Sequence, residues 1–139
     1  MSVGISEEGS PVDDRCLRID LDGGGAVAYS PPVRVGPLFD YIVEGWIKTQ
    51  GLKHDHAFLS ITFVDEERRR LETFYSESVS LGDAWKQLRI GPVTPSEAST
   101  WYAILGLHLE PGEQADLTGT ALFDDIRLAR LPQLSLDLD

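Results

Sequence analysis

The chain has 139 residues, which is enough for one domain with its own hydrophobic core and leaves little room for a second. Hydrophobic residues make up 42% of the sequence and charged residues 25%, a composition that excludes an intrinsically disordered chain. Asp and Glu number 23 against 12 Lys and Arg, and the resulting net charge of −11 disfavours nucleic acid and anionic membrane surfaces as partners.

Short stretches of alternating polar and apolar residues, separated by turn residues, predict β-strands along most of the chain. One helical turn over 95–98 is the only helix expected. No apolar run of about 18 residues predicts insertion into a membrane. The strands expected, in chain order, are 17–21, an irregular edge strand within 27–35, 41–48, 57–64, 71–75, 85–90, 103–109 and 121–128.

About eight strands without a long helix predict an all-β fold, and this number of antiparallel strands favours a two-sheet jelly-roll β-sandwich. We expect the jelly roll to occupy residues 15–132. A flexible or degenerate N-terminal segment over 1–14 precedes it, without the basic and apolar regions of a signal peptide. An acidic C-terminal tail over 133–139 follows it and is expected to fray.

Four segments, in this order, give the sequence a family resemblance: 17–24, 41–48, Trp85 with Leu88, and 119–128. The Phe-Asp-Asp-Ile run in the last segment is the most specific. In these segments the chain resembles the galactose-binding-domain-like jelly rolls that serve as carbohydrate-binding modules, in the group of families four, nine and twenty-two. The family usually has one more strand before the first segment, where this chain has only the polar residues 1–14.

The resemblance implies a non-catalytic carbohydrate-binding module with a polysaccharide or oligosaccharide as its partner. Such a module would belong, with neighbouring domains, to a larger extracellular, periplasmic or cell-envelope protein. The alternative is a structural or protein-interaction β-sandwich that does not bind sugar. A small hydrolase with two facing carboxylates is the third hypothesis, but the sequence has no nucleophile elbow, phosphate loop or Cys-x-x-Cys motif and does not indicate an enzyme.

Sugar recognition needs flat aromatic faces and a few polar groups on an outer sheet face or in the end loops. Strand alternation places Glu44, Trp46 and Lys48 opposite the core face of one strand, and Tyr102 and His108 opposite the core face of another. We expect a concave sheet to bring these side chains together. Trp46 and Tyr102 would be the stacking platforms, and Glu44, Lys48 and His108 would supply hydrogen bonds. The alternative is an ordinary sheet surface, or one covered by a neighbouring domain.

Other aromatic and charged residues give weaker indications. Trp101 stands at a strand entrance and is either a binding residue in a loop or a lid on the core, whereas Trp85 is expected in the core. Phe58 lies on the same outer face as the hydrogen-bonding candidates. His54-Asp55-His56 has the alternation of a metal chelate, but a solvated loop is favoured. The run 66–70, two Glu followed by three Arg, predicts a self-neutralising turn.

Asp124 and Asp125 lie within an apolar strand, where a buried carboxylate needs a cation, backbone donors or solvent. The family resemblance points to a structural calcium held by this pair, with Asp13 as a further ligand and Asp14 or Glu8 as others. The alternative is an aspartate pair at a β-bulge, hydrogen-bonded to backbone amides. The single cysteine, Cys16, excludes an internal disulfide and is expected to be a small buried residue.

Overall fold

The computed structural model describes residues 2–6, 16–21, 25–51, 56–79, 84–110 and 119–132. Within these ranges the chain forms ten β-strands and no helix, which confirms the predicted all-β fold and leaves no helical segment able to cross a membrane. The helical turn expected over 95–98 is wrong, since the chain instead makes a reverse turn closed by the Thr100 amide and the Glu97 carbonyl, 3.1 Å apart. The strands are β1 Ser2–Ser6, β2 Cys16–Leu21, β3 Ala26–Tyr29, β4 Val33–Arg34, β5 Phe39–Gln50, β6 His56–Val64, β7 Arg70–Tyr75, β8 Lys86–Val93, β9 Tyr102–Glu110 and β10 Gly119–Pro132.

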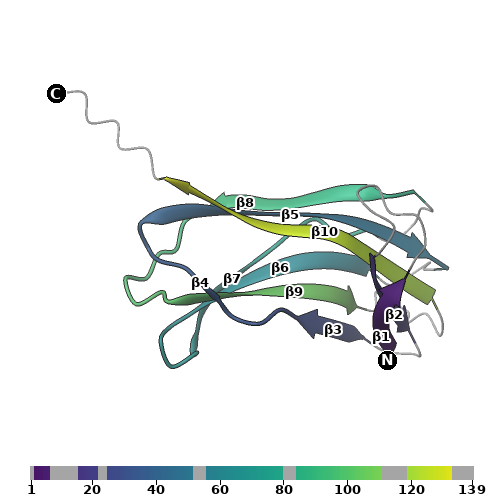
Figure 1. Ribbon diagram of the computed structural model, residues 1–139, viewed down its shortest axis with the longest axis horizontal. Helices are drawn as coiled ribbons and strands as arrows, with labels where there is room; N and C mark the ends of the chain where they lie inside the picture. Colours follow the sequence, from purple (N-terminus) through teal and green to yellow (C-terminus); the bar gives the residue numbers. More distant parts are fainter. Residues whose placement is uncertain are drawn as a thin grey trace.

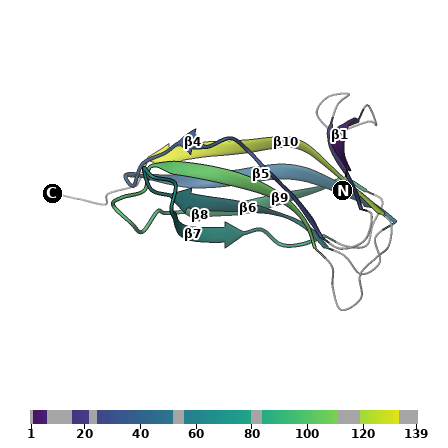
Figure 2. The same ribbon diagram turned by 90° about the horizontal axis from the view of Figure 1, so that it is seen from below.

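These strands form two antiparallel sheets that lie face to face (Figure 1). Sheet A has the strand order β1-β2-β10-β5-β8, and sheet B has the order β3-β9-β6-β7, with the short β4 also paired to β9. Figure 1 shows β8, β5 and β10 as the upper layer and β6, β9 and β3 as the lower one. Figure 2, seen from below, therefore looks toward the outer face of sheet B.

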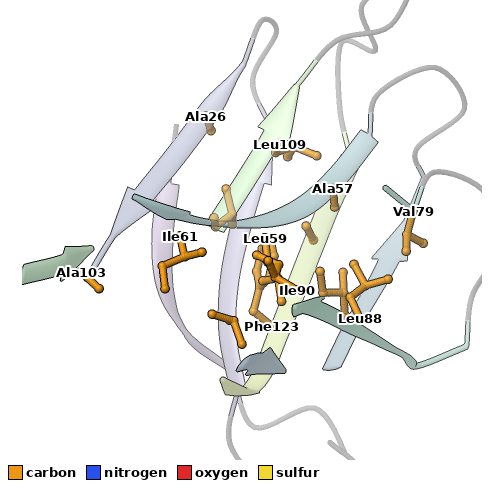
Figure 3. Packing of buried hydrophobic residues seen from close by; sticks show 14 of the residues in the cluster. Ala26, Ala57, Leu59, Ile61, Val79, Leu88, Ile90, Ala103, Leu109 and Phe123 are labelled. Carbon is orange, nitrogen blue, oxygen red and sulfur yellow. The ribbon is translucent and has the colours of Figure 1, made fainter. Parts of the chain in front are cut away.

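The core lies between the two sheets, because the apolar positions of each strand alternate toward the opposite layer. Figure 3 shows side chains from both sheets meeting there. Burying one Leu, Ile or Phe side chain contributes about 1.5–3 kcal/mol, so a set of this size supplies the main stabilisation of the fold. The core includes Val43 and Ile47 of β5, Leu59, Ile61 and Phe63 of β6, Leu88 and Ile90 of β8, Leu109 of β9, and Ala121 and Phe123 of β10.

The N-terminal segment contributes a strand that the sequence pattern did not predict. β1 pairs antiparallel with β2 along its whole length and forms an edge of sheet A. β10 also runs further than predicted, to Pro132, because its last residues pair with the start of β5. The tail 133–139 lies outside the described residues.

Candidate functional site

The residues predicted to share one binding face lie on opposite sheets. Glu44, Trp46 and Lys48 belong to β5 in sheet A, whereas Tyr102 and His108 belong to β9 in sheet B. Since the outer faces of two packed sheets point in opposite directions, the expectation that one sheet brings all five together is wrong. Alternation along a strand shows which side chains face away from the core, but it does not show which sheet the strand joins.

On sheet A, Trp46 is half-buried and is in register with Gln87 of β8 and Asp124 of β10. The amide of Gln87 donates a long hydrogen bond of 3.4 Å to Glu44, and Arg89 lies 3.7 Å from the same carboxylate. Trp46 therefore has polar residues in register on both neighbouring strands, and the nearby Glu44 carboxylate is already engaged by Gln87 and Arg89.

Sheet B carries a cluster of four rings on its outer face, one from each of its four main strands. We call it the ring patch, and it consists of Tyr29 of β3, Phe58 of β6, Tyr75 of β7 and His108 of β9. The His108 imidazole stacks on Phe58 with ring centroids 4.7 Å apart and planes 4° apart. Tyr29 and Tyr75 meet the same imidazole edge-on, with centroid distances of 6.1 and 6.2 Å. His108 is thus the centre of the patch.

The rings differ sharply in exposure, so the ring patch has a buried centre and an exposed tyrosine on either side of it. His108 is only 8% exposed, whereas Tyr29 is 57% and Tyr75 60% exposed. A hollow of about 360 Å³ adjoins the patch and is lined by Phe58, Tyr75, Ser76, Ser78 and Glu110. The patch therefore combines accessible aromatic faces with hydroxyl and carboxylate groups, the mixture that recognition of a polyhydroxylated ligand needs.

Gly106 allows His108 to lie across the sheet. The His108 Nε2 atom is 2.7 Å from the Ser60 hydroxyl oxygen on the neighbouring strand. A Cβ atom at position 106 would overlap both that hydroxyl and the imidazole. The absence of a side chain at Gly106 therefore leaves the space in which the imidazole reaches the serine and stacks on Phe58.

Burial of His108 lowers the pKa of its imidazole below the ordinary value of 6.5, while the charge of Glu110 acts in the opposite direction and is the smaller influence. The neutral imidazole therefore predominates at neutral pH. A neutral ring has one nitrogen that donates and one that accepts, so it can pair with the Ser60 hydroxyl without leaving a buried charge.

The remaining aromatic candidates lie away from the ring patch. Tyr102 is at the other end of the sheet B face, with the Arg68 guanidinium 5.6 Å from its ring centroid. One face of Trp101 is covered by the Arg34 guanidinium, 3.0 Å from the ring centroid. Trp85 is partly buried just before β8, rather than fully buried in the core as expected.

The predicted aspartate pair lies at a β-bulge in β10, where the register with β5 shifts between Asp124 and Arg127. Asp125 has a left-handed φ of 48° and accepts a 2.7 Å charged hydrogen bond from Arg127. Asp124 is 6% exposed, and its Oδ2 atom has no hydrogen-bond partner from the described part of the chain. A cation would satisfy this oxygen.

The structure does not assemble a complete metal site from the residues that it describes. Within the described ranges, no three His, Cys, Asp or Glu side chains come together as a metal-binding group. The predicted ligand Asp13, with Asp14 and Glu8, lies outside these ranges, as do His54 and Asp55. Calcium binding by Asp124 and Asp125 therefore stays a prediction.

Tyr29 and Tyr75 belong to the site although the sequence pattern did not predict it. Tyr29 follows Val27 at the two-residue spacing of one strand face, and Tyr75 ends the strand that returns from the charged turn. These positions were the only signal, and it is weak. Each tyrosine joins the ring patch only because β3 pairs with β9 and β7 pairs with β6. The first pairing joins residues far apart in the sequence, such as Tyr29 and Gly106, and the second joins consecutive strands.

Comparison with known proteins gives matches in structure alone. No protein-family model matches the sequence, and no curated protein shows a significant match. A family 16 carbohydrate-binding module superposes with a TM-score of 0.62 at 12% identity, over 91% of this chain and 84% of that one. A CBM22-1 xylan-binding domain from Paenibacillus barcinonensis gives a TM-score of 0.60 at 14% identity, over 96% and 83%.

Larger proteins also contain this fold. The enzymatically active domain of tailspike protein 4 from bacteriophage CBA120 gives a TM-score of 0.66 at 10% identity, over 94% of this chain. The chain spans only 18% of that tailspike chain. At such low identity the likeness concerns the fold, and it confirms the resemblance inferred from the sequence: this chain has the two-sheet β-sandwich fold of carbohydrate-binding modules.

Proposed function

We propose that this domain is a non-catalytic carbohydrate-binding module and that the ring patch is its binding face. The observation that carries the proposal is the exposure of Tyr29 and Tyr75 on either side of the buried His108. Large aromatic rings that stay exposed on an outer sheet face offer apolar surface to a ligand. The C–H faces of a sugar ring are a suitable partner, and the hydroxyl and carboxylate groups beside Phe58 would bind sugar hydroxyls.

Two further observations support a carbohydrate as the ligand. The net charge of −11 repels anionic macromolecules but leaves a neutral sugar unaffected. Among the proteins with a similar fold, one is described as xylan-binding and another was solved in complex with β-1,4-galactotriose. A shallow site built on two tyrosines would bind modestly, and the affinity would be raised by other domains of a larger extracellular or cell-envelope protein.

The test is affinity gel electrophoresis of the purified domain with a panel of soluble plant, algal and bacterial polysaccharides. We expect Tyr29→Ala and Tyr75→Ala each to abolish retardation by a polysaccharide that retards the wild type. Both side chains are more than half exposed, so neither change should unfold the domain. Trp46→Ala is the matched control, because it removes an aromatic ring from the outer face of the opposite sheet.

Each result has a defined meaning for the binding face. Loss of binding in both tyrosine variants, with Trp46→Ala unchanged, supports the ring patch. Loss in Trp46→Ala alone would move the binding face to sheet A, together with Glu44 and Lys48. A wild-type domain that binds no polysaccharide in the panel would contradict the proposed function and favour a protein-interaction domain.

We also propose that Asp124 takes part in a structural calcium site. Its buried Oδ2 atom lacks a partner among the described residues, and carboxylate oxygen is a ligand that Ca²⁺ prefers. Calcium there would stabilise the bulge of β10 and would have no part in sugar binding, because Asp124 belongs to sheet A and the ring patch to sheet B.

A further inference from the structure

The outer face of sheet B continues past the ring patch into a second hollow. We call it the arginine hollow. It has a volume of about 260 Å³ and is lined by Tyr29, Thr62, Val64, Arg68, Arg70 and Ile104. Tyr29 belongs to both the ring patch and the arginine hollow, so the two sites adjoin on one face.

The pairing of β6 and β9 sets the distance between the two sites. Phe58 stands opposite His108 in the ring patch, and Thr62 stands opposite Ile104 in the arginine hollow. Four residues of strand separate Phe58 from Thr62, which is about 13 Å at about 3.3 Å per residue. A short oligosaccharide lying along β6 would therefore contact the ring patch and the arginine hollow at the same time.

The three consecutive arginines of the β6–β7 turn are not equivalent. The Arg69 guanidinium pairs with Asp65 at 2.8 Å and with Glu67 at 2.6 Å, so its charge is neutralised within the turn. Arg68 and Arg70 line the arginine hollow and are exposed, and the described part of the chain gives neither of them an acidic partner. Asp65, Glu66 and Glu67 balance the three arginines in number, as the self-neutralising turn predicts. Among the described residues only Arg69 is ion-paired with these acids, so Arg68 and Arg70 present their charges at the hollow.

The arginine hollow presents two guanidinium groups that form no ion pair with the described residues, and Arg68 also lies 5.6 Å from the Tyr102 ring centroid. A guanidinium binds a carboxylate through two parallel hydrogen bonds, which makes arginine well suited to recognise this planar group. At physiological salt, charges beyond about 8 Å are largely screened. A single carboxylate bonded to Arg68 and Arg70 would therefore be influenced mainly by the β6–β7 turn, in which acidic and basic residues are equal in number, whereas the overall negative charge would repel a densely charged polyanion.

We propose that the ligand is a glycan in which a uronic acid occurs within an otherwise neutral chain. Its carboxylate binds Arg68 and Arg70, and its neutral sugars stack on the ring patch. This inference rests on the proposed function, since it assigns the ligand class of the same face. It predicts a preference for glycans with isolated carboxylates over the same glycans without them.

The probes are glucuronoxylan and a pectic polysaccharide of low charge density, each compared with its carboxyl-reduced form, which keeps the linkages and removes the charge. Dextran sulfate beside dextran tests whether sulfate is preferred. We expect the wild type to bind the uronate form of at least one probe on the order of tenfold more tightly than its reduced form, the effect of one charged hydrogen-bonding pair. Affinities would be measured by affinity electrophoresis and calorimetry.

Two double variants each remove two arginines, from opposite sheets, and so change the net charge equally. Arg68→Gln with Arg70→Gln should bring the uronate and reduced forms to nearly equal affinity. Arg89→Gln with Arg130→Gln removes two arginines from sheet A and should keep the preference. Arg68→Gly is a further variant of the arginine hollow. Position 68 has a left-handed backbone conformation that glycine adopts readily, so this change should not unfold the domain.

The outcomes separate the ligand class from the proposed function. Equal binding of uronate and reduced glycans through Tyr29 and Tyr75 would overturn the uronate assignment and leave the carbohydrate-binding function intact. A stronger response to dextran sulfate than to either uronate probe would also overturn it. Binding of no glycan by the wild type would overturn both. A preference that both double variants retain would place the carboxylate away from the arginine hollow.

Discussion

At the scale of single residues, the ring patch depends on the position and protonation of His108. This side chain contacts three other rings and pairs with Ser60, so it fixes the spacing between the exposed tyrosines. Because it is almost fully buried, it must remain neutral and hydrogen-bonded to avoid the cost of an unpaired charge. Two changes at this scale test its importance.

Replacing Gly106 by alanine should displace His108 from Ser60. The new Cβ atom would overlap the imidazole and the serine hydroxyl, so the expected loss of unfolding free energy is about 1–3 kcal/mol, the usual cost of overpacking. Urea denaturation measures this loss, and polysaccharide binding should weaken as the patch rearranges. Gly36→Ala is the matched control, since a Cβ there meets no atom within 4 Å and the change should stay below about 1 kcal/mol. Equal effects of the two variants would contradict the proposed part of Gly106.

The lowered pKa of His108 makes stability depend on pH in a defined direction. Below its ordinary value of 6.5 the unfolded chain takes up this proton more readily than the folded one. The contribution of neutral His108 is therefore complete above about pH 6.5 and is lost as pH falls through the lower folded pKa. Between pH 7 and 5 we expect Tm to fall more steeply in the wild type than in His108→Gln. Parallel curves for the two proteins would show that His108 does not titrate in this way.

At the scale of the secondary-structure elements, the β6–β7 turn holds Arg68 in an unfavourable conformation. Its φ of 66° lies in the left-handed region, which glycine adopts without the steric cost of a side chain. The Asp65 carboxylate stabilises the turn, because it accepts hydrogen bonds from the backbone amides of Glu67 and Arg69 at 3.0 and 2.8 Å. The chain thus places a cation at a position where local geometry favours glycine.

Arg68→Gly should therefore leave the domain as stable as the wild type, or more stable by up to about 1 kcal/mol, while it weakens binding of uronate glycans. Arg70→Gly is the control, because Arg70 lies within β7 and glycine in a strand costs about 0.5–1 kcal/mol. Both variants should lose the uronate preference, although only Arg70→Gly should lose stability. Denaturant unfolding and affinity electrophoresis on the same samples give the two measurements. A clear loss of stability in Arg68→Gly would contradict the strain argument.

Most of the individual strands could be predicted, because their information is local. Alternation along 57–64 and 103–109 depends only on neighbouring side chains and gave the correct core and outer faces of β6 and β9. β1 has the short, mixed pattern Ser-Val-Gly-Ile-Ser, which does not by itself predict a strand. It forms a strand by pairing with β2. The bulge of β10 was one of the two explanations that the sequence allowed for the aspartate pair, the other being a calcium site.

At the scale of the whole molecule, the candidate site could be predicted only in part. His108 was correctly placed on an outer face, but its neighbours depend on which strands join sheet B. Which strands join sheet B is determined by contacts between distant parts of the chain, such as β3 with β9. Local alternation of polar and apolar residues does not indicate these contacts. Trp46 was therefore grouped with residues from which the core separates it.

The overall charge of the molecule provides the last prediction. A net charge of −11 destabilises the compact fold by self-repulsion, so screening by a salt such as NaCl should raise Tm. Calcium bound at Asp124 would raise Tm further, by the free energy of binding to the folded state alone. We expect CaCl₂ to raise Tm more than NaCl of equal ionic strength in the wild type, and EDTA to reverse the difference. In Asp124→Asn the two salts should act alike.

The same variant separates a calcium site from a merely buried carboxylate. Without calcium, Asp124→Asn removes a buried charged group whose Oδ2 lacks a partner among the described residues, so the variant should be no less stable than the wild type in EDTA. If calcium raised Tm equally in both proteins, its effect would be screening of the negative surface rather than binding at the bulge. Because Asp124 and the ring patch lie on different sheets, polysaccharide affinity should stay unchanged in the variant. Stability and binding would then respond separately to the two faces of the sandwich.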